Sequence, residues 1–229
     1  MSVKPLIISG KRELCDQKIV DLLVKQAHNL LKKKDHLVLG IPGGSSVSGI
    51  FSLLKESNLP WERIHLFMVD ERVVPLTSEE SNFFLAKKTF LTDLVENSQL
   101  PQQNIHPYTK KNGVKSYQQQ LQQLGGKFDL LILSAGGDGH IASLFPFHQA
   151  LQTPASTLFT LISDSPKPPP QRMTASPSLI TASNLTFLLF YGVQKRSAYK
   201  NFLNPSTSTQ ECPAKLILQT KKPVIATSL

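Results

Sequence analysis

Four polar segments of the sequence contain side chains that could bind an anion or transfer a proton. They are Gly43-Gly44-Ser45-Ser46, Asp70-Glu71-Arg72 followed by Asn82, Gly136-Gly137-Asp138-Gly139-His140, and Gly192-Val193-Gln194-Lys195. Glycine lets a backbone N–H approach a bound anion, and hydroxyl groups and cationic side chains add to the binding. His140 stands in a glycine-rich segment and is a candidate general base. Together the segments predict a site where an anionic substrate undergoes proton transfer.

Each segment also has a simpler structural interpretation. For Gly136–His140 it is that a lone histidine usually has a structural role. The Gly43–Ser46 segment could be only a tight connection from strand to helix, and it lacks the GxxxxGK[ST] spacing of a nucleotide-binding P-loop. Asp70-Glu71-Arg72 could be a solvated turn, and Lys195 could simply be exposed. A lysine at a helix start is unfavourable against the helix dipole, however, unless an anion binds there. The sequence has no GxSxG motif, so we do not expect a covalent acyl-enzyme.

Apolar runs alternate with amphipathic segments along the whole chain, which is typical of a parallel sheet covered by helices. We therefore predict a doubly wound α/β fold. Strands are expected at Leu6–Ser9, His36–Ile41, Ile64–Val69, Asn104–Tyr108, Phe128–Leu133, Thr157–Ile162, Leu185–Tyr191 and Pro223–Ala226. Helices are expected at Arg12–Lys34, Ser45–Glu56, Asn82–Leu94, Ser116–Leu124 and Gln194–Leu203. Ligands of such sheets bind beyond the carboxyl ends of the strands, and each of the four polar segments follows a predicted strand.

The proline-rich segment Ser163–Pro177 could be taken for a linker between domains. It carries Lys167 and Arg172, and it separates two predicted strands, Thr157–Ile162 and Leu185–Tyr191, that we expect to be neighbours in one sheet. A stiff proline loop in that place can form the rim of a binding site. We therefore predict a single domain over residues 1–229.

The 229-residue chain has a net charge of +9, and its basic part is C-terminal: residues 163–229 contain 8 Lys and Arg against 2 Asp and Glu. Such an excess suits nucleic acid and a small anionic substrate equally well, but no RNP, KH or helix-turn-helix pattern favours nucleic acid. Apolar runs such as Leu130–Leu133 and Phe187–Tyr191 are far shorter than the ~20 residues that span a bilayer. Cys15 and Cys212 lie far apart, outside any metal-binding cluster. We expect a cytoplasmic protein without a membrane partner, disulfide framework or metal.

Several stretches resemble the 6-phosphogluconolactonase family, in order and over nearly the whole chain. They are Pro42–Ser46, Asp70-Glu71-Arg72 with Pro75 and Ser81-Asn82, Asp138-Gly139-His140 through Ser143-Leu144-Phe145-Pro146, Pro170 with Arg172-Met173-Thr174, and Gly192 with Lys195. The resemblance implies a three-layer α/β/α sandwich with a mostly parallel, Rossmann-like sheet, shared with glucosamine-6-phosphate deaminases. It also implies hydrolysis of 6-phosphoglucono-δ-lactone to 6-phosphogluconate, the second step of the oxidative pentose phosphate pathway, without metal or organic cofactor. The chain departs from the family pattern at Ser134, Gly137 and Phe147 and in the last strand.

The substrate that the resemblance implies is a cyclic ester with a phosphate dianion, so its enzyme needs a base and an anion site. We predict that His140 is the base and that Asp138 or Asp70 orients the imidazole or the attacking water. Backbone N–H groups of the Gly136–Gly139 loop, or Arg72, would stabilise the oxyanion. The predicted binding residues are Gly43, Gly44, Ser45, Ser46, Asn82, Gly137, Gly139, Arg172 and Lys195, of which Gly44, Ser45, Arg172 and Lys195 are assigned to the phosphate.

Two other functions fit parts of the pattern. A sugar-phosphate deaminase or isomerase of the same fold would share Asp138-Gly139-His140, but deaminases look like Asp-Gly-His-Ile-Ala-Phe-Asn-Glu. This chain continues Ala142-Ser143-Leu144-Phe145-Pro146 without the glutamate, and Arg72 stands where deaminases typically have tyrosine. A non-catalytic sugar-phosphate sensor is the second alternative, and the presence of His140 in an intact loop argues against it. We expect the chain to be a monomer.

Overall fold

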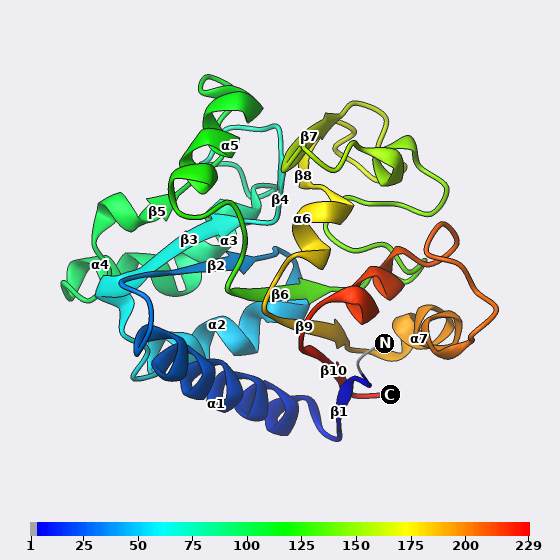
Figure 1. Cartoon of the computed structure of the whole chain (residues 1–229), viewed down its shortest axis with the longest axis horizontal. Coiled ribbons are helices and arrows are strands. Elements are labelled where there is room, and N and C mark those ends of the chain that lie inside the picture. Colours follow the sequence, from blue (N-terminus) through cyan, green and yellow to red (C-terminus); the bar gives the residue numbers. More distant parts are fainter. Residues whose placement is uncertain (1–3) are drawn as a thin grey trace.

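The computed structural model describes residues 4–229 and is built on a parallel sheet of seven strands in the order β1-β10-β9-β6-β2-β3-β5 (Figure 1). The strands are β1 (Leu6–Ser9), β2 (Leu37–Ile41), β3 (Ile64–Met68), β5 (Ile105–His106), β6 (Leu130–Ser134), β9 (Leu185–Phe190) and β10 (Pro223–Thr227). All neighbouring pairs among them are parallel. The strands predicted at these positions are confirmed, and the last one, β10, lies between β1 and β9.

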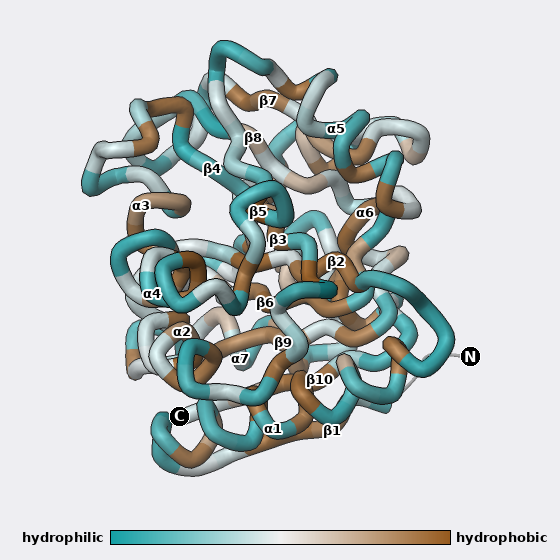
Figure 2. Tube along the Cα trace, turned by 90° about the vertical axis from the view of Figure 1, so that its left-hand side faces the viewer, coloured by the Kyte–Doolittle hydropathy of each residue, from teal (hydrophilic) through white to brown (hydrophobic). Residues whose placement is uncertain are grey.

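Helices cover both faces of the sheet. α1 (Arg12–Leu31), α2 (Ser48–Lys55), α3 (Asn82–Ala86) and α4 (Thr92–Glu96) pack on one face, and α5 (Gly113–Gln123), α6 (Pro177–Thr181) and α7 (Arg196–Leu203) on the other. Successive side chains of a strand point to opposite faces, so Leu39 of β2 packs with the first group and Val38 with the second. The central strands form a largely hydrophobic interior in Figure 2. The predicted three-layer α/β/α fold is confirmed.

A second sheet of three antiparallel strands differs from the prediction. It consists of β4 (Asp70–Arg72), β8 (Arg172–Ala175) and β7 (Phe159–Ile162), with Arg72 opposite Arg172. The expectation that Thr157–Ile162 and Leu185–Tyr191 are neighbours in one sheet is wrong. β9 already pairs with β6 on one side and β10 on the other, so no edge is left for β7, which pairs with β8.

The predicted helices are present with altered ends. α1 ends at Leu31 instead of Lys34, and the region predicted as one helix over Asn82–Leu94 contains a π-helical turn between α3 and α4. α2 and α7 are each preceded by a 3-10 turn after a glycine with positive φ, +87° at Gly44 and +89° at Gly192. The π turn is Lys87–Leu91, and the 3-10 helices are Ser45–Val47, Trp61–Arg63, Gln102–Asn104, Gln149–Gln152, Val193–Lys195 and Pro213–Gln219. Among residues 4–229, no helix has the length and apolar character that a membrane crossing needs.

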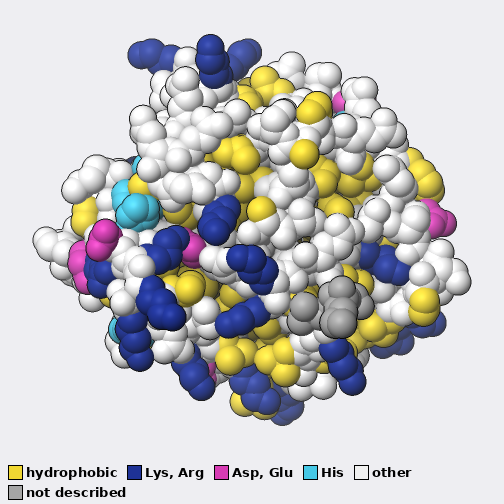
Figure 3. Space-filling model, in the orientation of Figure 1, with side chains coloured by type: hydrophobic (Ala, Val, Ile, Leu, Met, Phe, Trp, Pro, Cys, Tyr) yellow, Lys and Arg dark blue, Asp and Glu magenta, His cyan; other side chains and the backbone are white. Residues whose placement is uncertain are grey.

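The surface reflects the net charge of +9. Many lysine and arginine side chains and few acidic ones lie on the face shown in Figure 3. The prediction of one domain over residues 1–229 stays a prediction, and residues 1–3 of it lie outside the part that the structure describes.

Three histidines form a row across neighbouring strands: His36 precedes β2, His65 is the second residue of β3 and His106 is the last residue of β5. The ring centroids of His36 and His65, and of His65 and His106, are 5.3 Å apart. His65 Nδ1 lies 3.0 Å from His106 Nε2, and His106 Nδ1 lies 2.9 Å from Oε1 of Gln120. Because an amide oxygen can only accept, His106 carries its proton on Nδ1 and accepts from His65. Burial, followed by the neighbouring His106 and His36, lowers the pKa of His65 to about 4.

We expect this row to make the fold sensitive to acid. The unfolded chain protonates His65 below its ordinary pKa of 6.5, whereas the folded protein does so only near 4, so stability falls as the pH is lowered between these values. For a partly exposed ring the loss should be on the order of 1–2 kcal/mol. Urea unfolding of the wild type and His65→Gln at pH 7 and 4.5 measures it: the variant should lose less stability than the wild type, and equal losses would contradict the prediction. His28→Gln, which removes an exposed histidine, is the control.

Candidate active site

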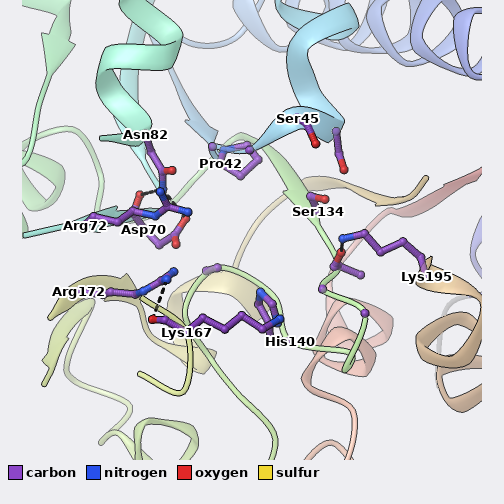
Figure 4. A pocket seen from close by; sticks show the side chains of 17 residues that line it. Pro42, Ser45, Asp70, Arg72, Asn82, Ser134, His140, Lys167, Arg172 and Lys195 are labelled. Carbon is purple, nitrogen blue, oxygen red and sulfur yellow. Dashed lines mark hydrogen bonds between the residues drawn. The ribbon is translucent and has the colours of Figure 1, made fainter. Parts of the chain in front are cut away.

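A cavity of about 220 Å³ lies beyond the carboxyl ends of the central strands. Its lining residues are Pro42, Gly43, Gly44, Ser45, Ser46, Asp70, Arg72, Asn82, Ser134, Ala135, Gly136, Gly137, His140, Ala142, Lys167, Arg172 and Lys195 (Figure 4). They come from the turns and loops after β2 and β6, from the small sheet and the loop between β7 and β8, from the start of α3 and from the turn before α7. Four of these side chains are lysine or arginine and only one is a carboxylate, so the cavity suits an anionic ligand.

All but two of the predicted site residues line this cavity. Those that do are Gly43, Gly44, Ser45, Ser46, Asp70, Arg72, Asn82, Gly137, His140, Arg172 and Lys195. Asp138 does not line it and instead contacts the ring of His140. Gly139, with φ +86°, packs against Cys212, whose Sγ would lie 2.9 Å from an added Cβ. Gly139 therefore shapes the loop and does not face the cavity.

His140 is held at the cavity wall by three neighbouring side chains. Its Nδ1 is within hydrogen-bonding distance of Asp138 Oδ1 and lies 3.3 Å from Lys167 Nζ. Lys167 Nζ is also 3.3 Å from Asp138 Oδ2, and the Phe145 ring centroid is 4.7 Å from that of the imidazole. Burial would raise the pKa of Asp138, but the hydrogen bond and charge of His140, together with Lys167, lower it overall. Asp138 is thus a carboxylate that accepts a hydrogen bond from Nδ1–H of His140, which leaves Nε2 able to take up a proton.

Gly136 provides the space that the His140 ring occupies. A Cβ at this position would lie 2.0 Å from His140 Nδ1 and 2.6 Å from Asp138 Oδ1. We expect Gly136→Ala to displace the imidazole and lower kcat at least about tenfold, because a misplacement of about 1 Å can cost about 100-fold. Steady-state kinetics of the variant and the wild type measure this change in kcat. Gly125→Ala, at an exposed turn with φ +101° and open space around the new Cβ, is the control for backbone strain away from the cavity and should keep kcat. An unchanged kcat in Gly136→Ala would contradict the expectation.

Asp70, Asn82 and Ser143 form a hydrogen-bonded group at another wall of the cavity. Asn82 Nδ2 donates to the backbone oxygen of Asp70 at 2.9 Å and to its Oδ1 at 3.3 Å, and Ser143 Oγ donates to Oδ2 at 2.8 Å. Both oxygens of the Asp70 carboxylate therefore have partners within this group. Gly43 touches the same group, since a Cβ there would lie 1.9 Å from Asn82 Oδ1.

Glu71, the middle residue of the segment Asp70-Glu71-Arg72, is buried away from the cavity. Its carboxylate accepts from the backbone N–H groups of Arg72 and Asn82 at 2.7 Å, from that of Phe83 at 2.8 Å and from Ser81 Oγ at 3.0 Å. Burial raises the pKa of Glu71, and these hydrogen bonds oppose the rise. Glu71 thus fixes the start of α3 and, through it, the position of Asn82 in the cavity.

Arg172 holds the proline-rich segment against the cavity. Its guanidinium donates to the backbone oxygens of Lys167 at 3.1 Å, Pro168 at 2.8 Å and Pro169 at 3.1 Å, and it lies 3.5 Å from Ser143 Oγ. Its position in β8, opposite Arg72, fixes the loop relative to the small sheet. The segment is therefore a rim of the cavity, as the sequence suggested, and it brings Lys167 to His140.

Ser45, Ser134 and Lys195 lie together at the end of the cavity away from Arg72 (Figure 4). The Lys195 ammonium donates to the backbone oxygen of Ala135. Burial, and then the charge of Lys167, lowers the pKa of Lys195, while Asp138 opposes the change. Since an ammonium has three donor hydrogens, Lys195 can donate to a ligand anion while it also donates to the backbone oxygen of Ala135.

Several cavity residues were not predicted as site residues by name. Pro42, Ser134, Ala135 and Ala142 were not predicted to act in the site, whereas Gly136 and Lys167 were considered only as parts of the Gly136–Gly139 loop and of the proline-rich segment. Ser134 is the last residue of β6 and Ala135 follows it, so their position directly after the predicted strand Phe128–Leu133 was a usable signal. Of the departures from the family pattern, Ser134 lines the cavity, whereas Phe147 lies outside it with φ +58° and 73% exposure. A glycine would adopt that φ without strain, whereas a phenylalanine adopts it at a cost.

Comparisons with known proteins agree with this fold. Residues 10–226 match the family model described as glucosamine-6-phosphate isomerases/6-phosphogluconolactonase. A 6-phosphogluconolactonase of Borreliella burgdorferi is 33% identical over 202 residues, which cover 86% of each chain. The crystal structure of a 6-phosphogluconolactonase from Shewanella baltica superposes with a TM-score of 0.85 at 25% identity and full coverage of both chains. A monomeric glucosamine-6-phosphate deaminase shares the fold, with a TM-score of 0.77 at 19% identity and 97% coverage of each chain.

Proposed function

We propose that this chain, which belongs to the glucosamine-6-phosphate isomerase/6-phosphogluconolactonase family, hydrolyses 6-phospho-D-glucono-1,5-lactone to 6-phospho-D-gluconate. The observation that carries the proposal is the pairing of His140 with Asp138 in a cavity that four cationic side chains line. A base beside an anion site is what hydrolysis of a phosphorylated lactone needs. We propose no metal or organic cofactor for the reaction.

In the proposed reaction His140 is the general base. Nε2 takes a proton from the water that attacks C1, and the resulting tetrahedral intermediate carries the negative charge on the former carbonyl oxygen. Collapse of the intermediate breaks the bond between C1 and the ring oxygen, and His140 returns its proton to that oxygen. Asp138 orients the ring, because its carboxylate accepts from Nδ1, whereas the Asp70 carboxylate is bound by Asn82 and Ser143.

We assign the oxyanion to Gly137 N–H or to Arg72. The N–H groups of Gly136 and Gly139 already donate within the loop, to the backbone oxygens of His140 at 2.8 Å and Gly136 at 3.1 Å. Gly137 lines the cavity next to His140, and so does Arg72, whose Nη1 also donates to the Glu80 backbone oxygen at 2.6 Å. Donors already fixed before reaction stabilise a developing charge at little reorganisation cost.

We assign the phosphate to the end of the cavity formed by Gly44, Ser45 and Lys195, with Arg172 contributing its charge. The turn after Gly44 presents backbone N–H groups and hydroxyls at the start of a helix, and Lys195 faces it across the cavity (Figure 4). The guanidinium of Arg172 is largely engaged with backbone oxygens, so we expect it to act on the phosphate mainly through its charge.

The deaminase alternative is less consistent with the residues around His140. Phe145 stands at the position of the glutamate in the deaminase pattern, and its ring packs against the imidazole. No carboxylate is therefore supplied there for ring opening. A non-catalytic sensor would need no base, and the His140–Asp138 pair argues against it.

Proton release from freshly generated 6-phosphoglucono-δ-lactone, with the spontaneous rate subtracted, tests the proposal. Unphosphorylated gluconolactone tests the need for the phosphate, and ammonia release or uptake with sugar phosphates tests the deaminase. We expect fast hydrolysis of the phosphorylated lactone, only a slow reaction of unphosphorylated gluconolactone, and no release or uptake of ammonia. A rate equal to the spontaneous one would overturn the lactonase assignment. We further propose that the chain acts as a single-domain monomer, which sedimentation of the purified protein tests.

A further inference from the structure

We propose that Arg12, outside the cavity, is a positioning residue that fixes the Gly44–Ser46 turn in the orientation that binds the substrate's anionic group. The inference rests on the proposed function, because it concerns the phosphate end of the same site. Arg12 is the first residue of α1, whereas the turn connects β2 to α2, so two separate parts of the chain meet here. Arg12 does not line the cavity, while Gly44, Ser45 and Ser46 do.

The guanidinium of Arg12 binds the outer side of the turn. Its Nη2 donates to the backbone oxygen of Ser45 at 2.6 Å and to that of Ser46 at 3.1 Å. The Ser45 oxygen and the Ser46 N–H belong to one peptide group, and in a trans peptide they point in opposite directions. With the oxygen held by Arg12 on the outside, the Ser46 N–H is directed to the cavity side. A cation on the oxygen also polarises the peptide, which makes that N–H a stronger donor to an anion.

Arg12 is itself held in place. Its Nε lies 3.7 Å from Oδ2 of Asp16, which is only 3% exposed, and the guanidinium carbon lies 5.5 Å from the ring centroid of Tyr191. Asp16 in turn packs against the first turn of α2, since a Cβ on Gly49 would lie 2.3 Å from Asp16 Oδ2. The side chain of Arg12 is therefore held by Asp16 on one side and by the turn on the other. In this it differs from a mobile surface arginine.

The turn does not depend on Arg12 for its place in the fold. Ile50, Phe51 and Leu54 anchor α2 in the core, and β2 is buried between β3 and β6. Loss of Arg12 should therefore leave the fold and His140 unchanged and allow the peptide of Ser45 and Ser46 to rotate. Its effect should fall on anion binding and not on the chemical step.

The test compares Arg12→Met and Arg12→Lys with Lys18→Met, which removes the same charge from an exposed position of α1. We expect Arg12→Met to raise KM for 6-phosphoglucono-δ-lactone and Kd for 6-phosphogluconate and inorganic phosphate about tenfold, with kcat within about twofold. Arg12→Lys keeps the charge but cannot bind both oxygens in the same way, so it should be intermediate. Lys18→Met should match the wild type.

Three results would overturn the inference: unchanged KM and Kd in Arg12→Met, an equal change in Lys18→Met, or a fall in kcat as large as the rise in KM. Thermal unfolding of each variant sets a temperature at which all are folded, and Arg12→Lys provides the test if Arg12→Met does not fold. Phosphate binding is measured by calorimetry without turnover. If the wild type binds phosphate but does not hydrolyse the lactone, the proposed function fails, whereas the role of Arg12 is still decided by the phosphate Kd.

Discussion

Replacing His140 by alanine is expected to lower kcat by about 10²- to 10⁴-fold, the usual contribution of a positioned general base. The imidazole is the group at the cavity wall whose Nδ1 is bound by a carboxylate and whose other nitrogen is free to take a proton. No other histidine lines the cavity within residues 4–229. KM should change much less than kcat, because the base acts on water and the phosphate lies elsewhere in the site.

Proton release from the lactone measures this effect after subtraction of the spontaneous rate. His28→Ala, which removes an exposed histidine of α1, is the matched control and should keep the wild-type rate. A near-normal kcat in His140→Ala would show that the base is another group. An equal loss in His28→Ala would show that the kinetics report on folding and not on the site.

The main sheet and the glycine-rich turns could be predicted because their signals are local. Each strand of the main sheet is a short apolar run, and the four polar segments follow such runs, so the rule of ligands at the carboxyl ends of strands was sufficient to collect most of the cavity residues. Asp138 and Gly139 are the exceptions, because they follow a predicted strand but do not line the cavity. Gly139 belongs to the same glycine-rich segment as His140, but its positive φ turns it toward Cys212, which lies far away in the sequence.

The small antiparallel sheet could not be predicted for a physical reason. β4 is only three residues long, all of them charged, and it pairs with β8, which lies about a hundred residues further along the chain. Such a strand has no alternation of apolar and polar residues to identify it, and its stability comes from tertiary contacts. The position of Lys167 beside His140 depends on this sheet through Arg172, so that contact was also hidden.

The sequence also could not decide whether Asp70 or Asp138 is the partner of His140. Both carboxylates follow predicted strands, and the sequence offered no way to separate them. In the structure Asp138 contacts the imidazole, and Asp70 accepts hydrogen bonds from Asn82 and Ser143. Only the path of the loop after β6 distinguishes the two.

Replacing Lys195 by methionine is expected to raise KM for 6-phosphoglucono-δ-lactone by about 10- to 100-fold. A hydrogen bond to a charged group contributes about 1.5–3 kcal/mol, and about 1.4 kcal/mol corresponds to a factor of ten. Methionine keeps the apolar stem of the side chain in the partly buried position and removes only the ammonium. Burial and the charge of Lys167 lower the pKa of Lys195, and a bound phosphate would supply an opposite charge that favours the ammonium.

The effect of Lys195→Met should fall on KM because the phosphate is remote from C1 and is bound equally in the ground state and the transition state. The slow reaction of unphosphorylated gluconolactone, which lacks the anion, should therefore be the same in the variant and the wild type. Lys200→Met, on the exposed side of α7, removes an equal charge outside the cavity and should leave KM unchanged. An unchanged KM in Lys195→Met would place the phosphate at the Arg72 end of the cavity instead, and an equal rise in Lys200→Met would mean that overall charge, and not a contact with Lys195, determines substrate binding.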